Sequence, residues 1–438
     1  MRRRQLNRML VLAATLAACA AQAASFSAPA GAAATPSQLL GGVNVMGITP
    51  QESSAAADRA IAVAKSLHAK VVRTDAAWAE FEPKQAGELD QRTLEFADRL
   101  VNDAAAAGIK VVMTVESSPC WATTAPHALL AKCTPGRLSK ANAYPPRDPA
   151  AYASFAAFLA ARYGSKLAAI EIWNEPDQSN ELYFAGPEKP ARYAAVLRAA
   201  YPAIKQVAPS LQVLAGSLVG SNGAFLKALY KAGIKGFYDG LSVHFYNLTL
   251  ASVRSIHEVQ LANGDATPLW LAEFGWTSCY PHKVQQEQGC VTTATQAANL
   301  SNMIRSLARA HYLAAAIVYK LQDSTGENFG MLAAGGAHKP SFGALSQVLR
   351  SPTGSISPVT LTLSRSGSHV VASGSGPVGD FMRLEAFVAG ALRFRAIFTL
   401  NRFNRFKLSL PAVLGTTGLR IRVFQYWAGG GHAAQKQI

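Results

Sequence analysis

Between residues 39 and 350 the sequence alternates short apolar runs with longer amphipathic stretches rich in Ala and Leu. Short apolar runs are typical of buried strands, and the longer stretches are typical of helices. Regular alternation of the two indicates strand–helix units around a parallel sheet. We identify eight candidate strands, which begin near residues 39, 70, 110, 167, 211, 240, 268 and 314. Eight units predict a (β/α)8 barrel over residues 39–350, with insertions.

An open, doubly wound parallel sheet is the alternative α/β fold, but no GxGxxG motif follows the first strand. The stretch 148–164 shows the expected helix pattern. It begins with Asp148 as the cap and Pro149 in the first turn, and it ends at Gly164. The segment 117–148 is too long for an ordinary connection, and a loop of this length is typical of a functional element or an insertion.

After Pro352 the pattern changes to alternation with period two, interrupted by Gly, Ser and Pro. This pattern predicts a small β-sandwich over residues 356–438. The whole chain has a formal net charge of +16. After residue 351 the sequence contains ten Lys and Arg but only two acidic residues, Asp380 and Glu385. A basic surface of this kind attracts anionic polysaccharide, lipid headgroups or nucleic acid. An ordinary soluble surface fits the same composition.

The first 23 residues combine four arginines with an apolar run too short to span a bilayer, which predicts a secretory signal peptide. Two cleavage sites compete. The sequence "AQA" at 21–23 suits an ordinary signal peptidase, whereas "LAAC" at 16–19 is similar to a lipobox that would lipidate Cys19. We therefore expect an exported protein, either a lipoprotein of the periplasm or outer membrane or a secreted protein.

Four cysteines remain after the leader, and their short separations suggest the disulfides Cys120–Cys133 and Cys279–Cys290. Zinc binding is the rival interpretation, but the sequence contains no CxxC or HExxH spacing. We therefore expect two local disulfides and no metal.

Polar residues stand at the carboxyl ends of most of the predicted barrel strands. This is the edge where barrel enzymes carry their active sites. The residues are Asp75, Glu116, Asn174, Glu175, His244, Tyr246, Glu273 and Asp323. Glu175 and Glu273 end the fourth and seventh strands, so they are predicted to face each other across the mouth of the barrel. Two opposed carboxyl groups are what glycoside hydrolysis requires. Asp75 and Asp323 are expected to be hydrogen-bonding partners rather than catalysts, and Glu116 has no assigned role.

Three motifs resemble the clan of retaining glycoside hydrolases built on (β/α)8 barrels. They are "WNEP" at 173–176, "HFY" at 244–246 and "EFG" at 273–275. Within the clan, the stretch leading into "IEIWNEPD" is most similar to glycoside hydrolase family 39 and its relatives linked to bacterial exopolysaccharide. The resemblance implies that Glu175 is the general acid/base and that Glu273 is the nucleophile.

The same resemblance implies the roles of four further residues. It implies that Asn174 binds the substrate 2-hydroxyl, that Tyr246 hydrogen-bonds the nucleophile, that His244 lines the pocket and that Arg73 supports Glu273. The chain departs from the clan at strand eight, where "YKLQD" stands in place of the usual Trp. Trp276, Trp121 or Tyr144 is a candidate for the missing aromatic face, with ordinary packing as the alternative for each.

The sequence thus predicts a retaining glycosidase that cleaves an extracellular polysaccharide by double displacement, in an endo-acting manner. We expect it to act as a monomer, without a cofactor and without a nucleic-acid partner. An exo-glycosidase of the β-xylosidase or uronic-acid-releasing type is the alternative within the same class. A non-catalytic carbohydrate-binding lipoprotein is the alternative from another class, although a binder does not require the second carboxylate.

Overall fold

The computed structural model describes residues 39–46, 54–246, 249–279, 290–352, 356–377, 379–401, 404–415, 417–425 and 433–437. The predicted signal peptide, its lipobox and Cys19 lie outside the described residues. No helix in the described part of the chain is long and apolar enough to span a membrane.

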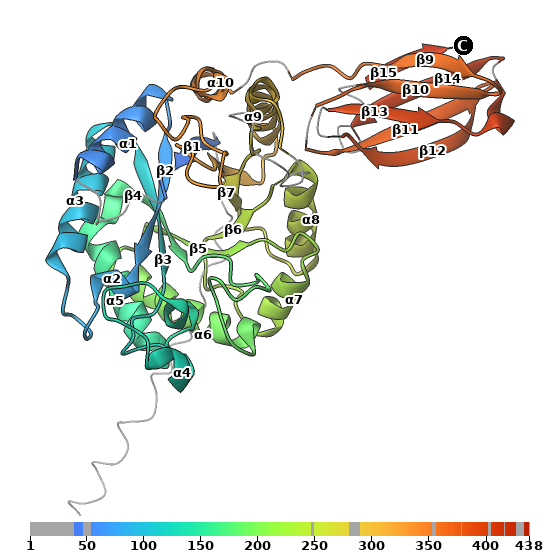
Figure 1. Cartoon of the computed structure of the whole chain (residues 1–438). Coiled ribbons are helices and arrows are strands. Elements are labelled where there is room, and N and C mark those ends of the chain that lie inside the picture. The colour runs from blue at the N-terminus through green and yellow to red at the C-terminus, as the bar shows by residue number, and fades with distance from the viewer. Residues whose placement is uncertain are drawn as a thin grey trace, which may run out of the picture. The chain divides into compact units, whose positions relative to one another are not determined.

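Eight parallel strands close into a barrel in which each strand pairs with its neighbour in sequence and β1 pairs with β8. All eight strands predicted from the sequence are present, and the (β/α)8 fold is confirmed (Figure 1). The strands are β1 (Leu40–Asn44), β2 (Val71–Ala77), β3 (Lys110–Glu116), β4 (Leu167–Ile172), β5 (Gln212–Leu218), β6 (Gly240–His244), β7 (Leu269–Phe274) and β8 (Leu313–Val318).

Helices cover the outside of the barrel (Figure 1). The predicted helix after residue 148 is α5, in which the Asp148 side chain accepts from the Ala150 N–H and Gly164 takes a φ of +43° at the end. The helices of this part are α1 (Ser54–Ser66), α2 (Trp78–Phe81), α3 (Gln91–Ala106), α4 (His127–Leu130), α5 (Pro149–Tyr163), α6 (Lys189–Val207), α7 (Ala224–Lys231), α8 (Thr249–Ala262), α9 (Thr293–Leu307) and α10 (Pro340–Arg350).

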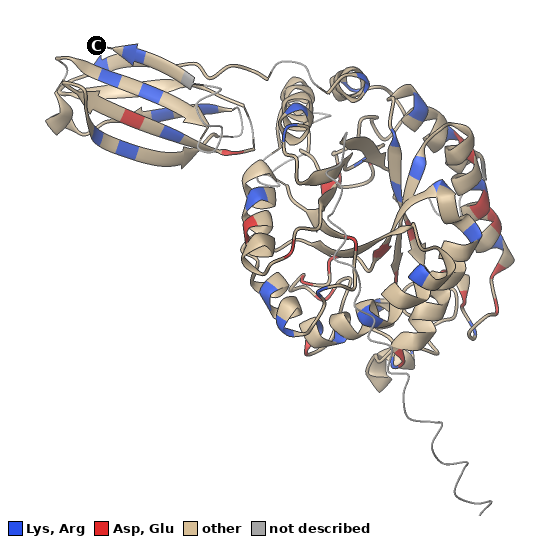
Figure 2. Ribbon diagram, turned by 180° about the vertical axis from the view of Figure 1, so that it is seen from behind, with Lys and Arg blue, Asp and Glu red and all other residues tan. Residues whose placement is uncertain are grey.

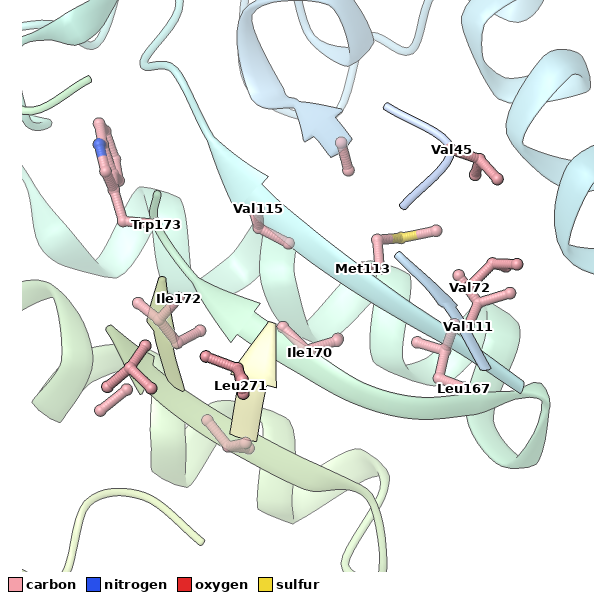
Figure 3. Packing of buried hydrophobic residues seen from close by; sticks show 14 of the residues in the cluster. Val45, Val72, Val111, Met113, Val115, Leu167, Ile170, Ile172, Trp173 and Leu271 are labelled. Carbon is pink, nitrogen blue, oxygen red and sulfur yellow. The ribbon is translucent and has the colours of Figure 1, made fainter. Parts of the chain in front are cut away.

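Buried apolar side chains form two layers in the barrel. The larger cluster contains side chains from both strands and helices, including Val72, Val111 and Leu167, which Figure 3 shows close together. A smaller cluster contains alternate strand residues such as Val71, Val112 and Ala169. Because successive strand side chains point to opposite faces, the smaller cluster fills the barrel interior.

The interior changes character toward the carboxyl ends of the strands. Two residues beyond Val71, Val112 and Ala169 stand Arg73, Thr114 and Glu171, all of them buried. Period two places these polar side chains on the same inward face as the apolar ones. The barrel is therefore apolar at one end and polar at the mouth, which is where the predicted site residues lie.

The chain beyond residue 356 forms two antiparallel sheets around a separate apolar core, which confirms the predicted β-sandwich. One sheet has the order β13-β10-β9 and the other β12-β11-β14-β15. Figure 2 shows Lys and Arg on several of these strands. The strands are β9 (Thr362–Ser366), β10 (His369–Ser375), β11 (Phe381–Val388), β12 (Ala391–Thr399), β13 (Arg405–Ser409), β14 (Leu419–Gln425) and β15 (Ala433–Gln437).

Two disulfides join Cys120 to Cys133 and Cys279 to Cys290, the pairs expected from the sequence. Disulfides of this kind persist in oxidising compartments, which fits a protein exposed outside the cytoplasm.

Removing the first disulfide by the double change Cys120→Ser and Cys133→Ser should lower the free energy of unfolding by roughly 3 kcal/mol, because the unfolded chain regains the freedom of the closed loop. Urea unfolding of the wild-type and variant proteins measures this difference. An unchanged unfolding midpoint would show that the loop contributes no cross-link entropy.

Candidate active site

The chain leaves β4 through a strained turn. Trp173 and Glu175 have positive φ values of 68° and 43°, and Pro176 follows. Such conformations cost non-glycine residues about 1–3 kcal/mol each and are frequent at functional sites. The turn ends the strict alternation of the strand, so Asn174 and Glu175 both enter the barrel mouth, where they are buried. Adjacent residues of a regular strand point to opposite faces, so only such an interruption lets both side chains share one pocket.

Glu273, on β7, is held by three donors. Arg73 Nη1 lies 2.8 Å and Asn44 Nδ2 3.2 Å from its Oε1, while the Tyr246 hydroxyl donates to Oε2 at 2.7 Å. Only 5% of Glu273 is exposed. The carboxylate is therefore fixed in position and hydrogen-bonded in its charged form, as a nucleophile requires.

Arg73 connects Glu273 to a second, deeper acid. Its Nε and Nη2 donate to Glu171 Oε2 at 2.9 and 2.6 Å, and Nη2 also donates to Asn174 Oδ1 at 2.8 Å. The Thr114 hydroxyl donates to the same Glu171 oxygen at 2.6 Å. Since the guanidinium binds the Oδ1 of Asn174, the amide nitrogen faces away from Arg73 and is free to donate to a substrate hydroxyl.

The 2.8 Å contact between Arg73 and Glu273 fits the role that the resemblance implied, whereas the sequence analysis missed Glu171 and Asn44. Glu171 is fully buried, and it stands inside the apolar run that identified the fourth strand. The two-residue alternation of the strand could have identified Glu171 as a site residue, because it lies two residues beyond the interior residue Ala169 and so points into the barrel. Asn44 carries a weaker signal as the last residue of β1.

Glu175 lies against His244, whose Nδ1 is 2.8 Å from Oε1, and the side-chain amide of Gln178 donates to Oε2. The same His244 nitrogen is 3.6 Å from Glu273 Oε2. Within this group, oxygens of the two glutamates lie within 4.8 Å of each other. This spacing fits the carboxyl separation of about 5–5.5 Å in retaining glycosidases, in contrast to the wider gap that accommodates a water in inverting enzymes.

The two glutamates differ in their electrostatic surroundings. Burial raises the pKa of Glu175 to about 8, and the charge of Glu273 contributes to the shift. Burial also raises the pKa of Glu273, but the Arg73 charge and the Tyr246 hydrogen bond act against this shift. Burial and Arg73 lower the pKa of His244 well below its usual range, so its imidazole is neutral. Near pH 7 burial therefore favours a proton on Glu175, while Arg73 and Tyr246 favour the charged form of Glu273.

Glu175, His244 and Glu273 also form a group whose ligand atoms lie close enough together to hold a metal ion. Carboxylate and imidazole ligands suit several divalent cations. In this arrangement, however, both Glu273 oxygens already accept hydrogen bonds, one of them from the positively charged Arg73. The Arg73 charge beside Glu273 repels a further cation, so the surroundings suit an organic substrate better.

The two predicted tryptophans lie in packing contacts. Trp121 donates from Nε1 to the Glu82 carbonyl at 2.8 Å and stands edge-on to Trp78, with the ring centroids 5.3 Å apart. Trp276 is only 5% exposed and stands edge-on to Phe274. Their proposed contact with a sugar stays a prediction.

Three other rings surround the nucleophile candidate. Tyr246 lies edge-on to Tyr319 and Phe329, with centroid distances of 6.1 and 5.4 Å. Tyr319 follows β8, where the clan carries its Trp, and sequence analysis missed Phe329. Asp323 in the same segment pairs with Lys339 at 3.0 Å and accepts from the Gly330 N–H, which fits the supporting role expected for it.

Tyr246→Phe should move the acidic limb of the pH–rate profile to higher pH. The change removes the hydrogen bond that lowers the pKa of Glu273. The pKa of Glu273 should therefore rise, and the nucleophile should become protonated, and thus inactive, at a higher pH than in the wild-type protein. The rate measured from about pH 4 to about pH 8 tests the shift. Tyr201→Phe, on the outer helix α6, is the matched control. A uniform loss of rate with an unmoved limb would contradict it.

Comparison with known proteins gives a family and several similar folds. The model of the family described as cellulase (glycosyl hydrolase family 5) matches residues 40–310. A family 39 glycoside hydrolase from Bacteroides cellulosilyticus WH2 is 20% identical with a TM-score of 0.56, and the match covers 85% of this chain and 81% of that chain. No curated protein matches the chain.

Two further solved structures illustrate the range of similar proteins. A family 39 β-xylosidase from Caulobacter crescentus is 15% identical with a TM-score of 0.54, covering 93% of this chain and 98% of that chain. A family 30 endoxylanase from Clostridium papyrosolvens C71 is 14% identical with a TM-score of 0.51, covering 89% and 97%. At such identities the likeness shows the fold, which a protein named as a β-xylosidase and one named as an endoxylanase share.

Proposed function

The chain belongs to the cellulase family, glycosyl hydrolase family 5, and from this premise and the geometry of the barrel mouth we propose that it cleaves an extracellular polysaccharide by double displacement. The predicted class, a glycoside hydrolase on a (β/α)8 barrel, is confirmed. The motifs most resembled family 39, and enzymes of that family are among the similar folds, whereas the matching sequence model is that of family 5.

The observation that carries the mechanism is the close, asymmetric pair of glutamates. Glu273, held by Arg73 and Tyr246, attacks the anomeric carbon of the sugar while Glu175 gives its proton to the departing oxygen. The product of this step is a glycosyl ester on Glu273. Its formation removes the charge beside Glu175, so the pKa of Glu175 falls and its carboxylate accepts a proton from the incoming water. Asn174 donates to the hydroxyl next to the reacting carbon.

Endo action is the finer part of the proposal. An exported protein with a long segment at the barrel mouth and a basic additional module suits a polymer better than a small glycoside. Product analysis by mass spectrometry after digestion of the host exopolysaccharide tests it. Oligosaccharides of mixed length support endo action, whereas release of one sugar at a time supports the β-xylosidase or uronic-acid-releasing alternative.

Residues 39–350 are proposed to act as the catalytic domain and residues 356–438 as a module that binds anionic glycan. We further propose that the protein acts as a monomer after export, either anchored through a lipid on Cys19 or secreted. A reducing-end assay on a panel of polysaccharides separates this enzyme from a carbohydrate-binding lipoprotein, since only the enzyme generates new reducing ends.

A further inference from the structure

A cavity of about 460 Å3 lies between the segment that follows β3 and the segment that follows β4. We call it the side cleft. Its lining contains both acidic and aromatic side chains. Among the lining residues are Glu116, Lys140, Tyr144, Glu181, Leu182 and Tyr183. The mechanism above uses none of these residues.

The walls of the side cleft are held in place by contacts between and within the two segments. The Ala185 N–H donates to the Ala143 carbonyl at 2.9 Å and joins one segment to the other. The buried Asn142 donates from Nδ2 to the Ser118 carbonyl at 2.8 Å, and the Cys120–Cys133 disulfide closes the same segment. The cavity is thus preformed, as ligand pockets usually are.

Gly186 allows the Tyr144 ring to approach the second segment closely. Its φ is +93°, and a Cβ at this position would lie 3.4 Å from two ring carbons of Tyr144 and closer still to Arg192. The left-handed conformation and the lack of space both favour glycine here. The Tyr144 ring is therefore packed on one side while it lines the cleft.

Two lining residues, Glu116 and Tyr183, tie the side cleft to the segments that leave the barrel mouth. Glu116 is the last residue of β3 and is buried at the barrel mouth, and Glu175 is among the charges that raise its pKa. Burial raises the pKa of Tyr183, and the charge of Glu175 raises it further. The Tyr183 carbonyl accepts from Trp173 Nε1 at 2.7 Å, which ties this wall to the turn that carries Glu175.

The lining combines flat apolar surface with a free polar group. Tyr144 and Tyr183 are half-buried, while Leu182 is 59% exposed at the rim. The Glu116 carboxyl group has no hydrogen bond to any described residue, which is unusual for a buried carboxyl group and leaves it available to a ligand. A pyranose ring presents an apolar face and an edge of hydroxyls, so it matches both features.

We propose that the side cleft binds a neutral sugar unit of the glycan, next to the unit cleaved between Glu175 and Glu273. In this complex Tyr144 and Tyr183 contact the sugar face, and Glu116 hydrogen-bonds its hydroxyls. The unit is neutral because burial at the base of the cleft disfavours a charged group, as the raised pKa of Glu116 shows, so a sugar carboxylate would lose its hydration there, and Lys140 lies exposed at the rim. This inference rests on the proposed function, because it assumes that the catalytic pair acts on a glycan.

The test measures binding to the full chain carrying Glu273→Gln, which keeps the site but prevents turnover. The probes are cello-, xylo- and manno-hexaose with the matching monosaccharides, which fill the catalytic position alone. Adding Tyr183→Ala should weaken binding of the preferred hexasaccharide by roughly tenfold, as loss of an aromatic contact of about 1.5 kcal/mol implies. Binding of the monosaccharide should stay within about twofold of the parent value.

Matched variants separate contact from disturbance of the fold. Tyr183→Phe keeps the ring and should retain hexasaccharide binding, Glu116→Gln should bind better than Glu116→Ala, and Leu261→Ala, an exposed change on α8, should alter nothing. Equal losses for hexasaccharide and monosaccharide, unchanged hexasaccharide binding in Tyr183→Ala, or no binding of any neutral hexasaccharide would each overturn the proposal. Failure of the proposed function has a different signature, namely chain-length-dependent binding without hydrolysis by the wild-type protein.

Discussion

Protein carrying Glu273→Gln should fold normally and lose turnover by at least about four orders of magnitude. The amide is nearly the same size as the carboxylate, and its oxygen can still accept the 2.8 Å hydrogen bond from Arg73. It cannot, however, form an ester with the anomeric carbon, so the first step of double displacement has no nucleophile. The measurement is kcat on the best substrate of the wild-type protein, with thermal unfolding as the check on folding.

A trapping experiment makes the assignment of the nucleophile specific. A 2-deoxy-2-fluoro glycoside with a good leaving group should accumulate as a covalent adduct on the wild-type protein, and peptide mapping should locate it on Glu273. Glu88→Gln, which changes an exposed carboxylate paired with Lys84, is the matched control and should retain full activity. An adduct on another residue, or a first product of inverted anomeric configuration, would contradict the double displacement.

Strands were predictable because their signal is periodic and local. The eight apolar runs predicted all eight barrel strands, and the carboxyl ends of parallel strands meet at one edge of a barrel. Glu175 and Glu273 could therefore be placed in one pocket before any coordinates were known. The pairing of Arg73 with Glu273 came from the resemblance to the clan, and the 2.8 Å contact fits it.

Residues that depend on contacts between strands were harder to identify. Glu171 reads as part of an apolar strand, and its burial is tolerable only because the Arg73 guanidinium from β2 and the Thr114 hydroxyl from β3 both reach it. Such compensation is a property of the folded barrel and leaves little trace in the β4 sequence itself.

Segments without periodicity could not be predicted. The strand β15 has the sequence "AAQKQ", which lacks β-branched and aromatic residues, and it forms by pairing with β14. The walls of the side cleft depend on contacts such as that between Ala185 and Ala143, which join distant parts of the chain. Likewise, the sequence places Trp121 in the long segment after the third strand and Trp276 just beyond the seventh, but it does not determine which way their rings point.

Protein carrying Glu175→Gln should lose activity according to the leaving group. Substrates with poor leaving groups need the proton of Glu175 and should slow by about 10²–10⁴-fold. Aryl glycosides with very acidic phenols depart without that proton, so their first step should be nearly unaffected. Steady-state and pre-steady-state rates for a series of aryl glycosides measure the difference, and a loss that is equal for all leaving groups would remove Glu175 from the role of acid.

The pH dependence of the wild-type rate should also show the ionisation of Glu175. Glu175 acts as the acid while protonated, so the rate with a poor leaving group should fall as the pH rises through its pKa of about 8, and Glu175→Gln should lack this basic limb. In the variant, hydrolysis of the glycosyl ester on Glu273 is slow because no carboxylate accepts a proton from the attacking water. Azide needs no base, so it should restore turnover and yield a glycosyl azide of retained configuration. If azide left the variant inactive, the limiting step would not be base-assisted attack on the ester, and Glu175 could not be serving both half-reactions.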